Sequence, residues 1–120
     1  MKIQLYQDQT VDVFMHCLQV IKQMDFVLQT ADYERGCIRG MKQSDVEAIY
    51  AMIEIQVTKP RYGYAVNVTS SCFTGSSGTF FHDSKNENEF AERFIEAIQP
   101  QKFENAFRLR DPEYILAVLL

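Results

Sequence analysis

The feature that constrains this chain most is a strict alternation of apolar and polar side chains near its middle. Apolar side chains occupy every second position there: Ile49, Ala51, Ile53, Ile55 and Val57. A period of two over nine residues is typical of a β-strand with one buried and one exposed face. We therefore expect a long strand over 48–58. Residues 44–47, Ser-Asp-Val-Glu, have the form of a helix-capping box and allow at most one helical turn before it.

Four further strands are predicted around this one. Residues 26–31 and 37–42 are β-branched and apolar enough for two strands, a fourth strand follows from 64 to about 72, and a short one lies at 79–82. The segment 73–78, Phe-Thr-Gly-Ser-Ser-Gly, indicates a loop between the last two. Sequential strands joined by short turns favour an antiparallel meander.

A tight hairpin turn is predicted between the first two strands, over Tyr33-Glu34-Arg35-Gly36. Gly36 supplies the left-handed conformation that the end of such a turn needs, because glycine has no Cβ to clash. Asp32 is placed to accept hydrogen bonds from backbone amides of the turn. Gly40, inside the second strand, indicates a bulge or a close approach of another part of the chain.

Two amphipathic helices are predicted, one before the predicted strands in the sequence and one after them. In residues 11–24 the apolar stripe consists of Val11, Phe14, Met15, Leu18, Ile21 and Met24, and Thr10 is the expected N-cap. The second helix lies within 83–100, with Asn86 or Asn88 as its cap. Its apolar stripe consists of Phe90, Phe94, Ile95 and Ile98.

These elements predict an α+β fold with two layers. An antiparallel meander of four or five strands carries both helices on one face, in the order α-β-β-β-β-(β)-α, which is a helix-grip arrangement. The 120 residues form one domain, with its core in about 10–99. Residues 100–120 form an apolar extension that packs on the domain or on a partner. Its last part, 112–120, is equally compatible with a helix and a strand.

Composition excludes several classes of function. The net charge of −4 gives no electrostatic basis for binding nucleic acid. No apolar run reaches the roughly 18 residues of a membrane-spanning helix. The three cysteines, Cys17, Cys37 and Cys72, lack the spacing of a zinc or redox site, so we expect free thiols, no metal and no cofactor.

Catalytic constellations are few, and each has a simpler interpretation. Cys72 with His82 or His16 would give a nucleophile and a base, but no catalytic motif surrounds them. The Gly/Ser loop 75–78 lacks the lysine of a phosphate-binding loop, and His82-Asp83 has no further ligand at metal-binding spacing. The glutamates of the second helix, Glu87, Glu89, Glu92 and Glu96, are expected to form a solvated face. We therefore expect no enzyme.

One surface is a candidate for docking a partner. The turns after the first and third strands of a meander lie at the same end of the sheet. That brings Arg35 near Lys59 and Arg61, with Tyr62 and Tyr64 beside them. Such a basic edge flanked by aromatic rings suits an acidic partner or a lipid headgroup. The alternative is a set of solvated turn residues, partly neutralised by neighbouring acids.

The hairpin also resembles a known family. Phe26, Leu28, Asp32, Gly36 and Ile38 match the hairpin pattern of small bacterial envelope lipoprotein domains. The outer-membrane assembly lipoprotein C family, with its helix-grip domains, is the named group that the stretch 10–99 resembles. The resemblance implies an interaction domain of the cell envelope without enzyme activity or cofactor. The chain departs from that family in lacking a signal peptide and a lipidated N-terminal cysteine.

The sequence thus predicts a non-enzymatic protein-interaction or structural domain, and the resemblance implies that it comes from an envelope lipoprotein. The alternative is a small cytoplasmic domain that binds a ligand in the cavity between sheet and helices. A protein partner is expected in the first case, and a homo-oligomer formed through the apolar C-terminus is a further option. The location is the periplasmic side of the envelope if a leader was removed, and the cytoplasm otherwise.

Overall fold

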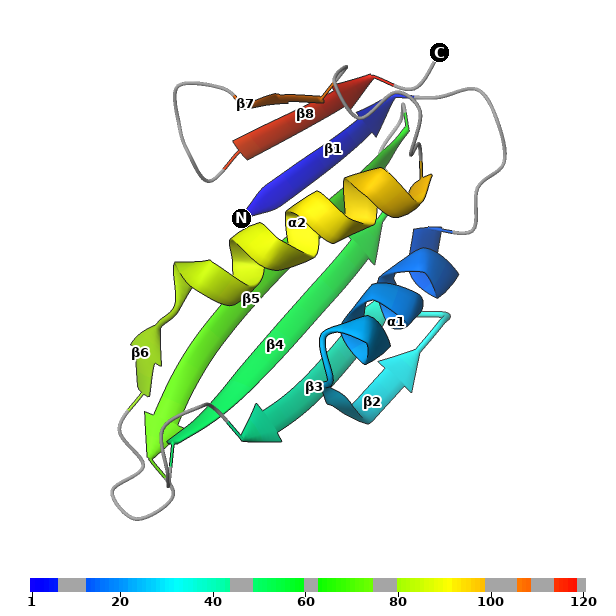
Figure 1. Cartoon of the computed structure of the whole chain (residues 1–120). Coiled ribbons are helices and arrows are strands. Elements are labelled where there is room, and N and C mark those ends of the chain that lie inside the picture. Colours follow the sequence, from blue (N-terminus) through cyan, green and yellow to red (C-terminus); the bar gives the residue numbers. More distant parts are fainter. Residues whose placement is uncertain are drawn as a thin grey trace.

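The computed structural model describes residues 1–6, 13–43, 49–59, 63–74, 80–98, 106–108 and 114–118. These residues form an α+β fold in which both helices cover the same face of one sheet (Figure 1). The strands and helices are β1 Lys2–Tyr6, α1 Val13–Gln23, β2 Val27–Asp32, β3 Cys37–Gln43, β4 Ile49–Thr58, β5 Tyr64–Thr74, β6 Phe80–His82, α2 Ser84–Ile98, β7 Ala106–Arg108 and β8 Tyr114–Val118.

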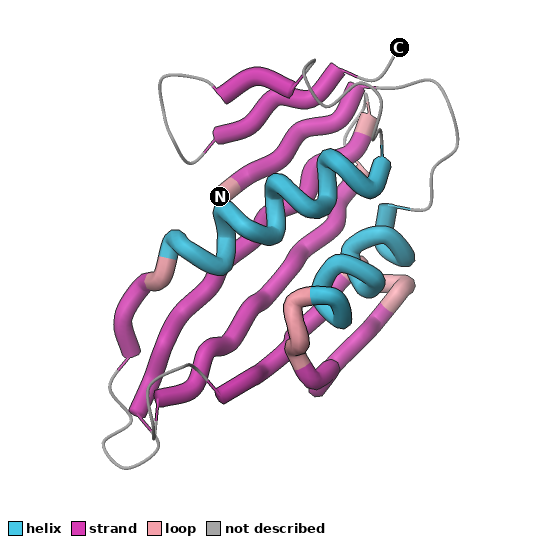
Figure 2. The backbone as a smooth tube through the Cα atoms, viewed as in Figure 1, coloured by secondary structure: helices cyan, strands magenta, loops and turns pink. Residues whose placement is uncertain are grey.

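The predicted meander is present. Strands β2 to β5 pair antiparallel in sequence order, and β6 pairs antiparallel with β5. The long alternating segment forms β4, which lies between β3 and β5 and is paired with both along most of its length. The two-layer arrangement with helices on one face is therefore confirmed (Figure 2). Among the described residues, no helix or strand lies on the other face of the sheet, which we call the uncovered face.

The sheet is wider than predicted, because its second half uses both ends of the chain. The strand order is β2-β3-β4-β5-β1-β8-β7. The sequence prediction began with a helix and missed β1, which pairs antiparallel with β5 and parallel with β8. The prediction that all strands pair antiparallel is thus wrong for one pair, β1 and β8. The apolar C-terminal segment, left open between helix and strand, forms β8 over Tyr114–Val118.

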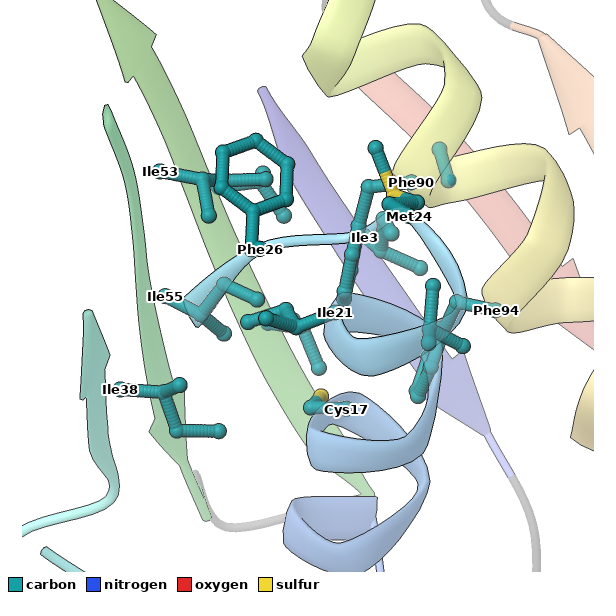
Figure 3. Packing of buried hydrophobic residues seen from close by; sticks show 14 of the residues in the cluster. Ile3, Cys17, Ile21, Met24, Phe26, Ile38, Ile53, Ile55, Phe90 and Phe94 are labelled. Atoms are coloured by element: carbon teal, nitrogen blue, oxygen red, sulfur yellow. The ribbon is translucent and has the colours of Figure 1, made fainter. Parts of the chain in front are cut away.

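The hydrophobic core lies between the helices and the sheet (Figure 3). Ile53 and Ile55 of β4 face Ile21 of α1 and Phe90 of α2 across this layer. The core extends beyond the predicted 10–99, because Ile3 and Leu5 of β1 are fully buried.

The buried stripe of α1 is rotated relative to the prediction. Cys17 and Val20 are fully buried, whereas Met15, placed on the stripe, is 45% exposed. The buried stripe of α2 contains the predicted Phe90, Phe94 and Ile95.

One glycine and one aspartate fix how α1 and the strand after it pack around this core. A Cβ on Gly40 would lie 3.0 Å from Phe26 Cβ and 3.3 Å from Ile21 Cγ2, so the missing side chain lets the end of α1 approach β3. Opposite Gly40, the register of β2 shifts between Leu28 and Thr30, as a β-bulge does. Helix α1 ends at Gln23, and Asp25 in the turn after it has a left-handed φ of 66°.

Candidate functional site

The predicted turn between β2 and β3 has well-defined geometry. Gly36 has a φ of 68°, the left-handed conformation that the hairpin requires. The amide of Arg35 donates to Asp32 Oδ1 at 3.2 Å, and the amide of Gly36 donates to the carbonyl of Tyr33 at 3.2 Å. The backbone of this turn is thus held by hydrogen bonds to Asp32 and Tyr33 and by the left-handed conformation of Gly36, as chain reversal requires.

The register of the sheet brings part of the predicted docking edge together. Cys37 pairs with Gln56 and Thr58 pairs with Ala65, so the turn carrying Arg35 and the turn after β4 lie at the same end of the sheet. Arg35 is 83% exposed and its Nε lies 3.7 Å from Asp32 Oδ2. The Nζ of Lys59 lies 5.5 Å from the centroid of the Tyr64 ring. Arg61 and Tyr62 lie outside the described residues.

A polar hollow adjoins this edge on the uncovered face of the sheet. Directly paired residues of neighbouring strands present their side chains on the same face, and the register forms one row of Thr30, Arg39, Glu54 and Thr69. Arg39 and Glu54 form an ion pair of 3.3 Å. These residues, with Gln56 and Asn67 of the next row, line a hollow of about 290 Å³. Its neutral hydrogen-bonding groups and internal ion pair suit a polar surface of a partner.

The same face becomes apolar toward its other end. Tyr50 and Phe73 are directly paired and their rings stack with centroids 5.7 Å apart. Met41 pairs with Met52 one row away, and Val27, paired with Met41 from the edge strand, is 70% exposed. The uncovered face therefore combines a polar half beside the basic edge with an apolar half, as interface surfaces often do.

The N-terminus of α2 is organised by Asp83, not by the asparagines that the sequence suggested as caps. Asp83 Oδ1 accepts from the amide of Lys85 at 3.0 Å, and Oδ2 accepts from Asn86 Nδ2 at 2.8 Å. The Cys72 thiol donates to the same Oδ2 at 3.5 Å. Burial, followed by the charge and hydrogen bond of Asp83, raises the pKa of the Cys72 thiol above its usual 9.0. Cys72 thus stays protonated near neutral pH, the opposite of an activated nucleophile.

The expected solvated face of α2 is wrong at Glu87, whose side chain is only 3% exposed. One carboxylate oxygen lies 2.7 Å from His82 Nε2, and the other lies 3.4 Å from the amino nitrogen of Met1. The imidazole of His82 is therefore hydrogen-bonded to Glu87, and the thiol of Cys72 donates its hydrogen bond to Asp83 rather than to His82. The burial of Glu87 could have been predicted from helical spacing. It precedes the buried Phe90, Ala91 and Phe94 by three, four and seven residues, which places all four on one face of the helix.

A larger groove lies on the helix-covered side, at the end where α1 finishes and α2 begins. It holds about 560 Å³ and is lined by the turn after α1, by the start of α2 and by the neighbouring strands, with Ala51 and Cys72 among the lining residues. Figure 1 shows the two helices spreading apart toward this end. The groove occupies the place between sheet and helices where the ligand-binding alternative expects a cavity.

Comparison with known protein families finds no match for this chain, and a search of curated proteins finds none either. The resemblance to the envelope lipoprotein family therefore stays a prediction. None of the described helices has the length and apolar character that crossing a membrane requires. Within the described ranges, no three His, Cys, Asp or Glu side chains gather closely enough to hold a metal ion.

Proposed function

We propose that this protein is a non-enzymatic interaction domain that docks an acidic segment of a partner protein on the uncovered face of its sheet. The observation that carries the proposal is the one-sided covering of a wide sheet. Both helices pack on one face (Figure 2). The described residues of the other face present a polar hollow, an apolar half and a basic edge.

Charge favours an acidic partner. The described residues of the uncovered face and its turn end carry four basic side chains against three acidic ones: Lys2, Arg35, Arg39 and Lys59 against Asp32, Glu34 and Glu54. The chain as a whole has a net charge of −4. This surface is therefore more positive than the rest of the molecule, and it guides an acidic segment toward the hollow. The Tyr50–Phe73 pair then supplies apolar contact area beside it.

A charge-reversal experiment tests this proposal. The Arg35→Glu/Lys59→Glu variant changes two exposed residues of the docking edge, and Lys22→Glu changes an exposed residue of α1 as the matched control. Each purified protein is used to capture partners from an extract of its source cells, at low and high salt, with quantitative mass spectrometry. Thermal melts check that all variants fold.

We expect an acidic protein to be retained by the parent and the Lys22 control, to be lost from the double variant, and to be released by salt. Equal retention by all three proteins would place the docking surface elsewhere. If the parent retains no protein above background, the interaction function itself is wrong.

The family resemblance adds an envelope location to the proposal. The coding sequence upstream of Met1 tests this addition separately. An apolar leader ending at a cysteine supports it, and a start codon at Met1 without such a leader removes it.

A further inference from the structure

We propose that the groove between the ends of α1 and α2 binds a small zwitterion, a molecule with an ammonium group at one end and a carboxylate at the other. This site lies on the helix-covered side and does not depend on the docking face proposed above. Its volume of about 560 Å³ falls within the range of small-molecule sites, and its lining comes from the turn after α1, the first half of α2 and the neighbouring strands.

Most charged groups of the groove are already held by the protein. Lys42 Nζ donates to the carbonyl of Met24 at 3.0 Å and lies 4.5 Å from the centroid of the Phe26 ring. Asp83 accepts from the amide of Lys85 and from Asn86, and Glu89 pairs with Arg93 at 3.2 Å. These groups form a fixed polar lining, because each has a partner within the chain.

Two opposite charges remain available. Neither the carboxylate of Asp25 nor the ammonium of Lys85 has a hydrogen-bond or ion-pair partner within the part of the chain that the structure describes. Asp25 lies in the turn after α1, and Lys85 lies in the first turn of α2, so the two charges come from separate segments that both line the groove. A free anion on one wall and a free cation on the other complement a ligand that carries both charges.

The position of Asp25 strengthens this assignment. Its φ of 66° is the left-handed conformation that glycine adopts most easily after a helix. The amides of Asp25 and Phe26 donate to the carbonyls of Lys22 and Ile21, at 3.0 and 3.2 Å, which is the hydrogen-bond pattern of a Schellman motif. A carboxylate thus stands at a position where backbone geometry favours glycine, and it lines the groove. The ammonium end of the ligand would lie beside it.

The floor between the two charges suits a short aliphatic chain. Ala51 and the protonated Cys72 thiol, both buried, line the groove from β4 and β5. A straight-chain amino acid would therefore place its methylene groups over this floor while its ends reach Asp25 and Lys85. The length of the methylene chain is therefore the variable of the experiment.

A series of straight-chain amino acids tests the proposal: glycine, γ-aminobutyrate and ε-aminocaproate. Caproate lacks the ammonium group and n-hexylamine lacks the carboxylate, so they are matched controls for the longest probe. Binding is followed by amide chemical shifts in two-dimensional NMR. We expect one member of the series to shift the signals of Ala51, Cys72 and Lys85, and both controls to bind at least about tenfold more weakly.

Variants of the two free charges complete the test. Asp25→Gly keeps the left-handed turn and Lys85→Met keeps a long side chain in α2, so both are expected to fold. Each should weaken the best probe about tenfold, while Lys22→Met, outside the groove lining, should leave binding unchanged. The doubly reversed variant Asp25→Lys/Lys85→Glu should recover binding, because a zwitterion can turn end for end.

Several results would overturn the proposal. They are an absence of binding by every member of the series, equal binding of caproate or n-hexylamine, and unchanged binding by the Asp25 and Lys85 variants. Because these residues are separate from Arg35 and Lys59, partner capture by the docking face would survive such a result. Failure of the zwitterion site is therefore distinguishable from failure of the proposed interaction function.

Discussion

Val57 donates its backbone amide hydrogen to the carbonyl oxygen of Gly36 at 2.8 Å, which ties the β2–β3 turn directly to β4. A Cβ on Gly36 would overlap the carbonyl oxygen of the same Val57. The glycine is thus required twice, once for its left-handed φ and once because the backbone of β4 passes beside it.

The first prediction separates these two requirements. Gly36→Asn and Gly36→Val should both destabilise the fold by on the order of 3 kcal/mol, since the overlap with Val57 affects any residue that has a Cβ. If φ alone mattered, Asn would be tolerated much better than Val, because Asn adopts the left-handed conformation readily. Denaturant melts measure the difference. Arg35→Ala is the control and should change stability by less than about 0.5 kcal/mol.

The sequence was sufficient for most of the meander, because its strands carry strong local signals. The alternation from Ile49 to Val57 predicted β4, and Asp32 together with Gly36 predicted the hairpin turn between β2 and β3. Strand β1 lacked such a signal. Its five residues carry only Ile3 and Leu5 as a pattern, and it forms because β5 and β8, far away in the chain, pair with its two edges. Pairing between distant segments leaves little trace in local periodicity.

Of the two candidate sites, one could be predicted from the sequence and the other could not. The end of the sheet that carries Arg35 and Lys59 followed from turn geometry, since strand order alone places those turns together. The free charges of Asp25 and Lys85 did not follow, because their availability depends on which neighbouring groups are already paired. Hydrogen-bond partners of this kind are a property of the folded arrangement rather than of spacing along the chain.

The second prediction concerns the reactivity of Cys72. Burial and the neighbouring Asp83 raise its pKa above 9.0, so the reactive thiolate is scarce at neutral pH. Alkylation of native protein by iodoacetamide should be slower at Cys72 than at the half-buried Cys37, and it should accelerate only above the usual titration range of a thiol. Peptide mass spectrometry over a pH series measures both rates.

Asp83→Asn tests the cause of this shift. Asparagine still caps a helix, so α2 is expected to remain folded. The substitution removes the negative charge beside the thiol but leaves its burial, so the pKa of Cys72 should fall and yet stay above its ordinary value. An alkylation profile that is identical in the parent and the variant would mean that Asp83 does not act on the thiol.

The third prediction addresses the end of α1. Asp25→Gly should leave stability unchanged or raise it by about 0.5 kcal/mol, because relief of the left-handed strain is partly offset by the greater freedom of glycine in the unfolded chain. Asp25→Val should lower stability by about 1–2 kcal/mol, since a β-branched residue tolerates this φ poorly. Urea titrations of the two variants compare them. A valine variant as stable as the parent would show that the turn adopts another conformation.

The last prediction concerns the buried carboxylate of Glu87. It binds His82 of β6 on one side and the amino group of Met1 on the other, so a single side chain of α2 joins both β1 and β6 to the helix layer. Glu87→Gln keeps the shape but removes the charge, and it leaves a buried ammonium with a weaker acceptor. We expect a loss of stability of about 1–3 kcal/mol.

Glu89→Gln is the matched control, two residues away on the same helix. Glu89 is more exposed and pairs with Arg93 at i+4, so its neutralisation should cost less than about 0.5 kcal/mol. Hydrogen exchange adds a local readout. In the Glu87 variant, amides of β1 and β6 should lose protection before those of β3 and β4, because the latter do not depend on the carboxylate. Equal stability of the two variants would mean that the contacts of Glu87 contribute no more than an ordinary surface pair.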